Sequence, residues 1–532
     1  YNVAVGRLAL LVNKTGSFNV AVGYGALDAN TTGGNNVGVG PNSLGANTTA
    51  SNNTALGNDV LKLTTTGGDN TAVGMSAMED NTTGTGNTAV GHDALEKNTT
   101  ANYNTGIGLE ALHVNTTGAN NVAVGAFSLD AHTTGQQNTG VGYGALGANT
   151  TADYNTAFGS GALGSVTTSE DNVAMGRAAL YHSTASDSTA VGSLALYLNT
   201  TGTQNTAVGR GALQSNTTAS YGVAVGWKAL DACTTGGNNT AVGHDALGAC
   251  TEGDLNVAIG SNALKANVLG DRNIAVGHNA LQAMNPASKA DTYNIAVGLN
   301  AGFNVTTGAN NTIVGSYAFA TNTTGNDNTA IGRDALRYST TGSENTALGK
   351  DALETCTTGA DNTGLGHNSL TSLTTGGHNT GCGEWSGQDV TTGTNNSFFG
   401  YASGSSNSPS GSVTTASNKI CLGNNSVTDA YIKVDWTVTS DKRDKTDITP
   451  FSHGLSWINK LNPVTYRWDE LEVEKEHGYG DTPDNMLITD INAEGNYGMQ
   501  YSRLIPVLIN AVKELSAKNN ALEARLAALE SA

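Results

Sequence analysis

Apolar and polar positions recur with a period of seventeen residues along the first four hundred residues of the chain, as in residues 87–103 (NTAVGHDALEKNTTANY). When the first residue of each unit, usually Asn, is counted as position 0, twenty-four units begin between Asn2 and Asn396. One residue is lost before Ser188, and four are added before Asn294. A fixed period of this length is typical of a solenoid in which each unit forms one coil.

Each unit is predicted to contain one short strand and a second inward anchor. Positions 1 to 3 read mostly Thr or Val, then Ala or Gly, then Val, Leu or Ile, a pattern that favours a strand with two different faces. Position 4 is glycine in every unit, which indicates positive φ or very close backbone approach. Positions 7 and 8 are usually Ala-Leu. A buried Val or Leu contributes roughly 1.5–3 kcal/mol, too little to offset the ordering entropy of an isolated unit, so the units must stack.

The small residue at position 2 indicates a crowded face. Ala72, Ala89, Gly106 and Ala123 hold this position in four successive units. Because a thin coil with such small side chains has little core of its own, we expect three chains to pack side by side.

Position 11 is usually the Asn of an NTTG or NTTA turn, but His132, Val166, Cys233 and Leu373 replace it elsewhere. A position that accepts these residues is predicted to point inward, with Asn side chains bonding along the stack. NTT also matches the N-glycosylation acceptor pattern, but an inward Asn would be inaccessible to a transferase. Five cysteines are too few and too scattered for a disulfide framework, so Cys233 and Cys250, one unit apart, are expected to be buried thiols.

The composition narrows the possible partners. The formal net charge is −19 and charged residues make up 13% of the chain, which disfavours binding to nucleic-acid phosphates or to anionic membranes. No run of eighteen apolar residues exists, so membrane insertion is not expected. The chain begins at Tyr1, in phase with the repeat, and not at Met. We therefore expect no signal peptide, and an N-terminal attachment region that lies outside this sequence.

The predicted domains are a solenoid over residues 1–404, a Gly/Ser-rich linker with a β-rich connector over 405–439, and a small α+β domain over 440–532. That domain is predicted to end in a helix over about 500–531. Leucines seven residues apart and a second apolar series with one polar member, Asn519, follow the d and a positions of a short coiled coil. The alternative is an amphipathic helix that packs on its own domain. The d series is Leu508, Leu515, Leu522 and Leu529, and the a series is Ile505, Val512, Asn519 and Leu526.

The N-x-A-x-G strand segment that recurs once per unit resembles the head repeats of YadA-like trimeric adhesins, which are left-handed parallel β-rolls. The resemblance implies a left-handed coil and a homotrimer. The unit here is longer than the usual head repeat, and its NTTG turn departs from it. The expected fold is mainly β, a long parallel β-solenoid of 17-residue repeats followed by a small chaperone domain that ends in a coiled-coil helix.

Three segments near the C-terminus carry a second resemblance: SDKRDKTDI, LNPVTYRW and YGMQYSRLIPVLINAVKEL. Residues 440–532 resemble the intramolecular chaperone and auto-processing domain of endosialidase-type phage tail spikes and fibres. The resemblance implies that this domain holds three chains together during folding and then cuts itself off with a Ser–Lys pair. The matching positions are Ser440 as nucleophile and Lys445 as base, and a third helper such as His453 or His477 stays open.

We therefore expect a structural, host-receptor-binding viral tail fibre on the virion, outside the cell, with a glycan or a surface protein as receptor. At most it is a single-turnover serine autoprotease, with no external substrate. One alternative is a cellular trimeric surface adhesin, which would need a membrane anchor.

Another alternative is a fibre that degrades polysaccharide, which would need two carboxylates at a controlled separation. The acids at position 6 are expected to be solvated on the outer face: Asp59, Asp93, Glu110, Asp245, Asp334 and Asp351. No cofactor or metal is predicted, because the histidines at position 5 are scattered along the stack: His92, His244, His278 and His367.

Overall fold

A computed structural model describes residues 1–431, 488–491, 497–499 and 501–531. The chain divides into two compact units, Tyr1–Ala430 and Tyr431–Ala532. Among the described residues, no helix is both long enough and apolar enough to cross a membrane.

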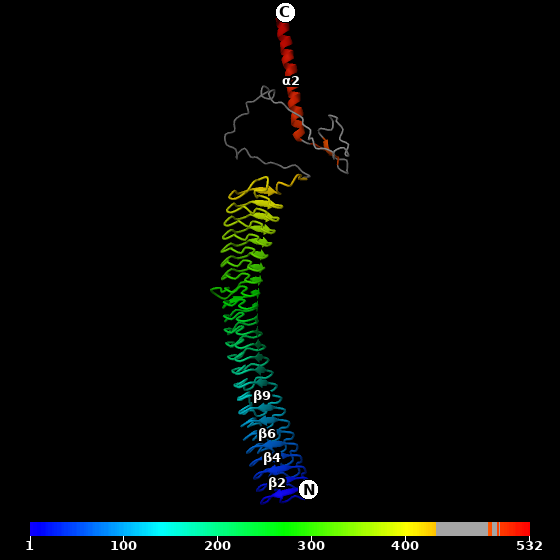
Figure 1. Cartoon of the computed structure of the whole chain (residues 1–532), viewed down its shortest axis with the longest axis vertical. Helices are drawn as coiled ribbons and strands as arrows, with labels where there is room; N and C mark the ends of the chain where they lie inside the picture. The colour runs from blue at the N-terminus through cyan, green and yellow to red at the C-terminus, as the bar shows by residue number, and fades with distance from the viewer. Residues whose placement is uncertain (432–487, 492–496, 500, 532) are drawn as a thin grey trace. The chain divides into compact units, whose positions relative to one another are not determined.

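The first unit is a parallel β-solenoid, drawn in Figure 1 as a gently curved stack of coils. Each coil adds one three-residue strand to a single 25-stranded sheet, which confirms the predicted fold class. At about 4.8 Å per strand, the sheet is on the order of 115 Å long. The strands are β1 (Val3–Val5), β2 (Val20–Val22), β3 (Val37–Val39), β4 (Thr54–Leu56), β5 (Thr71–Val73), β6 (Thr88–Val90), β7 (Thr105–Ile107), β8 (Val122–Val124), β9 (Thr139–Val141), β10 (Thr156–Phe158), β11 (Val173–Met175), β12 (Thr189–Val191), β13 (Thr206–Val208), β14 (Val223–Val225), β15 (Thr240–Val242), β16 (Val257–Ile259), β18 (Ile274–Val276), β20 (Ile295–Val297), β21 (Thr312–Val314), β22 (Thr329–Ile331), β23 (Thr346–Leu348), β24 (Thr363–Leu365), β25 (Thr380–Cys382), β26 (Ser397–Phe399) and β27 (Ile420–Leu422).

The register keeps every repeat position above its counterpart in the next coil. Position 2 pairs with position 2, as in Ala89 with Gly106, and the residue lost before Ser188 does not disturb this pairing, because Val173 still faces Thr189. The four residues added before Asn294 are accommodated in a loop. Within this loop, β19 (Ala290–Asp291) pairs in parallel with β17 (Gly270–Asp271) of the preceding coil.

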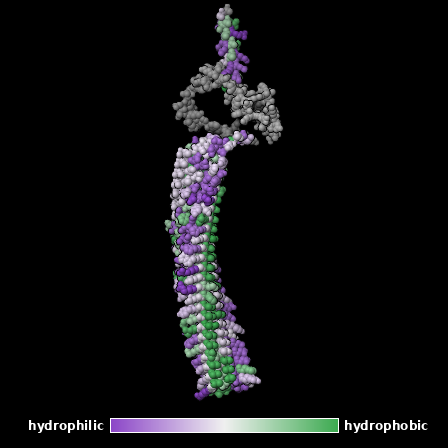
Figure 2. Space-filling view, in the orientation of Figure 1, coloured by the Kyte–Doolittle hydropathy of each residue, from purple (hydrophilic) through white to green (hydrophobic). Residues whose placement is uncertain are grey.

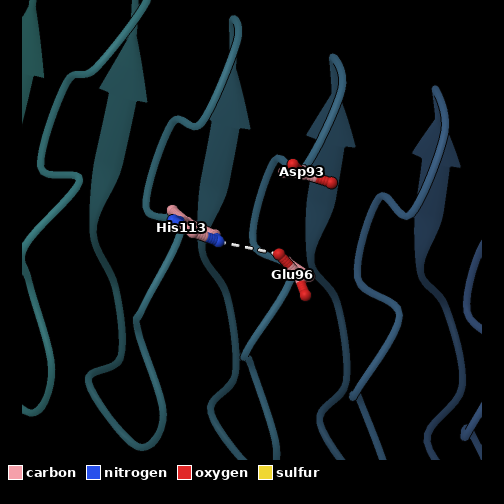
Figure 3. Close-up of side chains that lie close together, drawn as sticks. All are labelled: Asp93, Glu96 and His113. Carbon is pink, nitrogen blue, oxygen red and sulfur yellow. Dashed lines mark hydrogen bonds and ion pairs between the residues drawn. The ribbon is translucent and has the colours of Figure 1, made fainter.

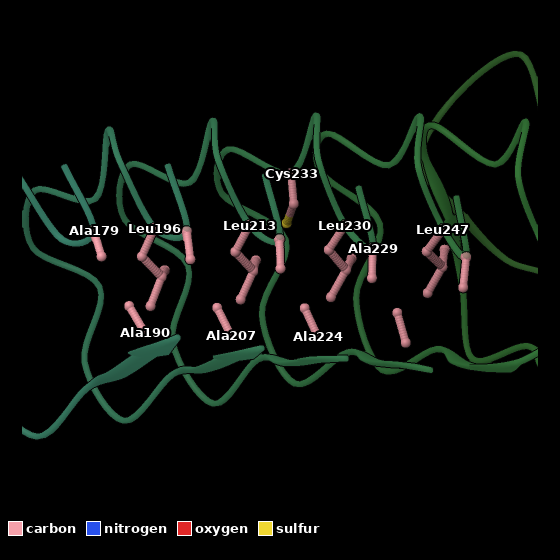
Figure 4. Packing of buried hydrophobic residues seen from close by; sticks show 14 of the residues in the cluster. Ala179, Ala190, Leu196, Ala207, Leu213, Ala224, Ala229, Leu230, Cys233 and Leu247 are labelled. Atoms are coloured by element: carbon pink, nitrogen blue, oxygen red, sulfur yellow. The ribbon is translucent and has the colours of Figure 1, made fainter. Parts of the chain in front are cut away.

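The core lies inside each coil. Figure 4 shows Leu196, Leu213, Leu230 and Leu247 in a row, with position-2 alanines on the strand side and position-7 alanines on the opposite side. Positions 7 and 8 are therefore inward anchors, as predicted, and position 2 faces the same interior. Our premise that a single coil has little core of its own was wrong, because the small side chains at position 2 make room for the leucine within the same chain. A Cβ on Gly106 would lie 3.2 Å from Cγ of Leu95.

Glycine at position 4 is required by both conformation and contact. From Gly6 to Gly383 its φ lies between +128° and +144°, a region that residues with a Cβ rarely adopt. A Cβ on Gly91 would lie 2.2 Å from the carbonyl oxygen of Gly108 in the next coil.

Three further positions adopt the left-handed conformation, which was not expected from the sequence. Positions 6 and 16 do so with side chains of many kinds, such as Asp93 at φ +57° and Tyr103 at φ +59°, and position 8 does so with leucine, such as Leu95 at φ +54°. Position 8 carries Leu, Met, Phe or Gly and never a β-branched residue. That exclusion indicates positive φ, because β-branched side chains tolerate it least.

Two internal ladders of Asn side chains run along the solenoid. At position 0, Oδ1 of Asn104 accepts a hydrogen bond from the backbone N–H of Asn121 at 2.9 Å, and its Nδ2 donates to the Gly118 carbonyl at 2.8 Å. At position 11, Nδ2 of Asn98 donates to Oδ1 of Asn81 at 2.9 Å. The Asn residues of both ladders are buried. The predicted inward Asn stack at position 11 is therefore confirmed, and Cys233 and Cys250 are buried free thiols, as expected.

In the second unit the structure describes an antiparallel pair, β28 (Ile488–Ile491) with β29 (Tyr497–Met499), and a long helix, α2 (Tyr501–Glu530). Leu508, Leu515 and Leu522 on one face of α2 are 53–69% exposed in the single chain. This face is the one that the heptad pattern assigns to a coiled coil, which stays a prediction.

Candidate functional site

The predicted catalytic pair, Ser440 and Lys445, lies outside the described residues, as do His453 and His477. Two other surfaces of the solenoid concentrate side chains that can meet a partner: the outer face of the sheet, and the face formed by positions 5, 6 and 9 of each coil.

An apolar band covers the outer face of the sheet. It consists of the apolar side chains at position 3 and of the side chains at position 1, which are mostly Thr, with Val or Ile in some coils; we call it the strand-face band. Figure 2 shows it as a green stripe along the solenoid. In every coil these two positions are exposed or half-buried, whereas position 2 between them is buried in every coil from β2 onward. Its most exposed members at position 3 include Val5, Leu56, Val90, Ile107, Phe158, Met175, Ile259, Leu348, Phe399 and Leu422.

The length of the strand-face band distinguishes it from ordinary surface hydrophobicity. Single exposed apolar side chains are common, but a contiguous apolar patch of more than a few hundred Å² marks an interaction surface. This band continues from coil to coil because each strand stacks in register on the previous one. A partner that covers it must therefore be long and regular.

The face formed by positions 5, 6 and 9 carries charged side chains that pair between neighbouring coils. Figure 3 shows Asp93, Glu96 and His113, whose possible ligand atoms lie within 4.8 Å of one another. Nε2 of His113 lies 2.7 Å from Oε2 of Glu96. Glu96 also pairs with Lys97, whose ammonium lies 3.2 Å from Asp80.

The electrostatics of Glu96 favour ion pairing over metal binding. Burial raises the pKa of its carboxyl, but hydrogen bonds from Lys97 and His113 outweigh this effect, so the pKa lies below its usual value. A cation entering the cluster would have to displace the Lys97 ammonium, and His113 would have to rotate away from Glu96. The cluster is therefore best described as part of an ion-pair network across the coils.

The acids at position 6 are also engaged by neighbouring cations. Asp334 accepts hydrogen bonds from Arg333 at 2.7 Å and Arg337 at 2.9 Å, and its side chain is only 4% exposed. Burial raises the pKa of the Asp59 carboxyl, but hydrogen bonds from Asn42 and Lys62 lower it by more. The pKa therefore lies below its usual value, and the carboxyl stays ionised. A general acid of a glycoside hydrolase needs the opposite shift.

Comparison with protein families gave one match. Residues 440–483 match the chaperone of endosialidase. The matched segment begins at Ser440 and contains Lys445, and it supports the resemblance noted for the C-terminal domain over part of its length. Searches of the curated proteins and of the solved structures found no match.

Proposed function

We propose that the chain is a homotrimeric viral tail fibre, in which the solenoid forms the shaft and the C-terminal domain directs trimer assembly. The observation that carries this proposal is the chaperone-of-endosialidase match in the same chain as a 25-stranded solenoid. On the virion, such a fibre would contact a receptor on the host cell surface. The same chaperone match supports that location.

The strand-face band supports side-by-side association of the chains. At roughly 25 cal/mol per Å² of apolar surface buried, covering such a band along many coils would stabilise an assembly strongly. A second copy of the chain has the same repeat and length, so it can cover the band coil by coil. In a three-fold arrangement, the three bands would face a common axis.

The helix α2 provides a test of the assembly role. Leu515→Asp with Leu522→Asp would place charges in the predicted coiled-coil interface, and burying unpaired charges there costs several kcal/mol. We expect wild type to have the mass of a trimer in native mass spectrometry, and this double variant to yield monomers or aggregates. Ala517→Asp with Ala524→Asp adds the same charges outside the predicted a and d positions and should leave trimers intact. A monomeric wild type would refute the proposal, and soluble trimers of the leucine variant would remove the assembly role from α2.

The chaperone match also supports self-cleavage at Ser440. A serine hydroxyl needs a base within hydrogen-bond reach, and Lys445 can serve only if desolvation lowers the pKa of its ammonium. The Ser440 hydroxyl would add to the carbonyl of an adjacent peptide bond, the amine would leave with a proton, and water would hydrolyse the resulting ester. Desolvation of Lys445 on folding would couple this cut to completed assembly.

Denaturing mass spectrometry tests the cleavage. We expect wild type to yield two fragments that meet next to Ser440, and Ser440→Ala and Lys445→Ala to yield the intact chain. Lys442→Ala, a neighbouring lysine in the same segment, should still be cut. Cleavage that survives both active-pair substitutions would rule this pair out, and an uncut wild type would leave the domain as a retained cap.

A further inference from the structure

A groove crosses the face formed by positions 5, 6 and 9 where two successive coils lack side chains. The coils that begin at Asn138 and Asn155 have glycine at both position 6 and position 9, and no other unit has both. These four residues are Gly144, Gly147, Gly161 and Gly164. They contribute to a groove of about 670 Å³, within the range of small-molecule sites.

The backbone does not require glycine at these places. Gly147 and Gly164 are not among the residues with positive φ, and Glu96 and Tyr197 hold the same position 9 in other coils. Gly144 has φ +59°, but Asp93 adopts φ +57° at the same position, and a Cβ on Gly144 would meet no atom within 4 Å. Glycine here removes side chains and opens space, unlike the glycine at position 4.

Aromatic rings line the groove. Phe127 meets Tyr143 edge to face, with ring centroids 5.7 Å apart, and Tyr143 is 64% exposed. On the other side, Tyr181 lies against Tyr197, with centroids 5.8 Å apart. The Tyr181 ring covers the floor, because a Cβ on Gly164 would lie 2.6 Å from its Cε2. The rings are thus held by neighbours and still present surface to the groove.

The groove is also lined by two side chains of opposite charge, Asp130 and Arg177. Neither has an ion-pair partner among the residues that the structure describes. Burial raises the pKa of the Asp130 carboxyl, although the backbone N–H groups of Asp130 and Ala131 lower it in part. Elsewhere on this face most acids pair with a cation of their own or a neighbouring coil, as Asp231 does with Lys228 and Asp245 with Lys265, so these two groups are available to a ligand.

The geometry points to a binding site for a short oligosaccharide. A sugar ring has an apolar C–H face that packs on the electron-rich face of an aromatic ring, and hydroxyls that donate to a carboxylate and accept from a guanidinium. Tyr143 and Tyr181 supply the rings, and Asp130 and Arg177 supply the two polar groups. The coils from Phe127 to Tyr181 span three strand spacings, roughly 15 Å, which suits a ligand of several linked rings.

This inference deepens the proposed function, because it names a receptor class and places its site. A matched pair of substitutions tests it. Gly147→Gln should fill the groove without disturbing the coil, since Gln214, Gln282 and Gln388 hold position 9 in other units. Gly248→Gln introduces the same side chain outside the groove. A Cβ would meet its nearest atom at 3.2 Å in both cases.

The probe is a printed array of microbial and animal oligosaccharides, followed by calorimetric titration with the free sugar that binds. We expect wild type and Gly248→Gln to bind with equal affinity, and Gly147→Gln and Tyr181→Ala to bind about tenfold more weakly or worse, a difference of about 1.4 kcal/mol. Thermal melting of all four proteins should coincide within a few degrees. No oligosaccharide bound by wild type, or equal binding by Gly147→Gln, would overturn the inference.

Failure of the groove and failure of the fibre proposal give different results. If the protein is trimeric and binds host cells, but Gly147→Gln binds them equally well, the fibre proposal stands and the groove is not the receptor site. If wild type is monomeric but still binds the sugar in the groove, the fibre proposal fails and the site remains.

Discussion

Gly91→Ala should prevent the coil at residues 87–103 from closing and should split the solenoid there. At φ +144°, an added Cβ would lie 2.2 Å from the carbonyl oxygen and 2.6 Å from the carbonyl carbon of Gly108. Both atoms belong to the backbone of Gly108, which is itself packed against Gly125 of the following coil, so neither can move without breaking the stack. We expect a loss of about 3 kcal/mol or more, seen as a lower onset of thermal unfolding and as new proteolytic cleavage near residue 91.

The matched control is Gly144→Ala. This residue also has positive φ, at +59°, but an added Cβ would meet no atom within 4 Å. Its effect on stability should stay within about 1 kcal/mol. If Gly91→Ala and Gly144→Ala unfolded at the same temperature, close approach between the position-4 glycines would not be what holds the coils in register.

Asn104→Leu is expected to have the second-largest effect. The Leu side chain would leave the buried N–H of Asn121 without its acceptor, which now lies 2.9 Å away, and would remove one of the donors to the Gly118 carbonyl. An unsatisfied buried donor costs about 1–3 kcal/mol, and the larger side chain adds crowding. Hydrogen exchange of the amides in this coil, which reports local opening, should accelerate by about tenfold or more.

Asn115→Leu makes the same change in the same coil, at position 11. Its Nδ2 donates to Asn98 and to the Gly118 carbonyl, which also accepts from Asn104. Leu373 occupies this position in another coil and is buried there, so the interior can accept the substitution. Exchange in Asn115→Leu should change little, and equal acceleration in both variants would contradict a special role for the position-0 ladder.

The period of seventeen, the strand at positions 1 to 3 and the invariant glycine were all predictable from sequence. Each depends on contacts between neighbouring coils that recur identically, so the same residue type is required at the same position of every unit. The positive φ of Leu95 and its counterparts was not foreseen, although the absence of β-branched residues at position 8 records it.

The candidate sites were predictable to a smaller degree. Ser440 and Lys445 come from a resemblance that the family match supports over residues 440–483, and their chemistry stays a prediction. The ion pair of Glu96 with His113 was missed, because nothing in the sequence pattern indicated that the position-9 side chains of neighbouring coils meet. The oligosaccharide groove was missed for the same reason, since glycine at Gly147 and Gly164 looks like any other glycine in a chain that has 69.

The sequence by itself determined that the chain stacks in a parallel solenoid with one strand per unit. The repeat period and the need for glycine at position 4 can both be read from the residues of a single unit and its neighbours. Only the tertiary structure decided which way each face points. Position 2 proved to face the interior of its own coil, so that positions 1 and 3 form the strand-face band outside. The physical reason is that a three-residue strand has no preferred inside until the rest of the coil closes over it, and the leucine at position 8 then selects the small side chain as its neighbour.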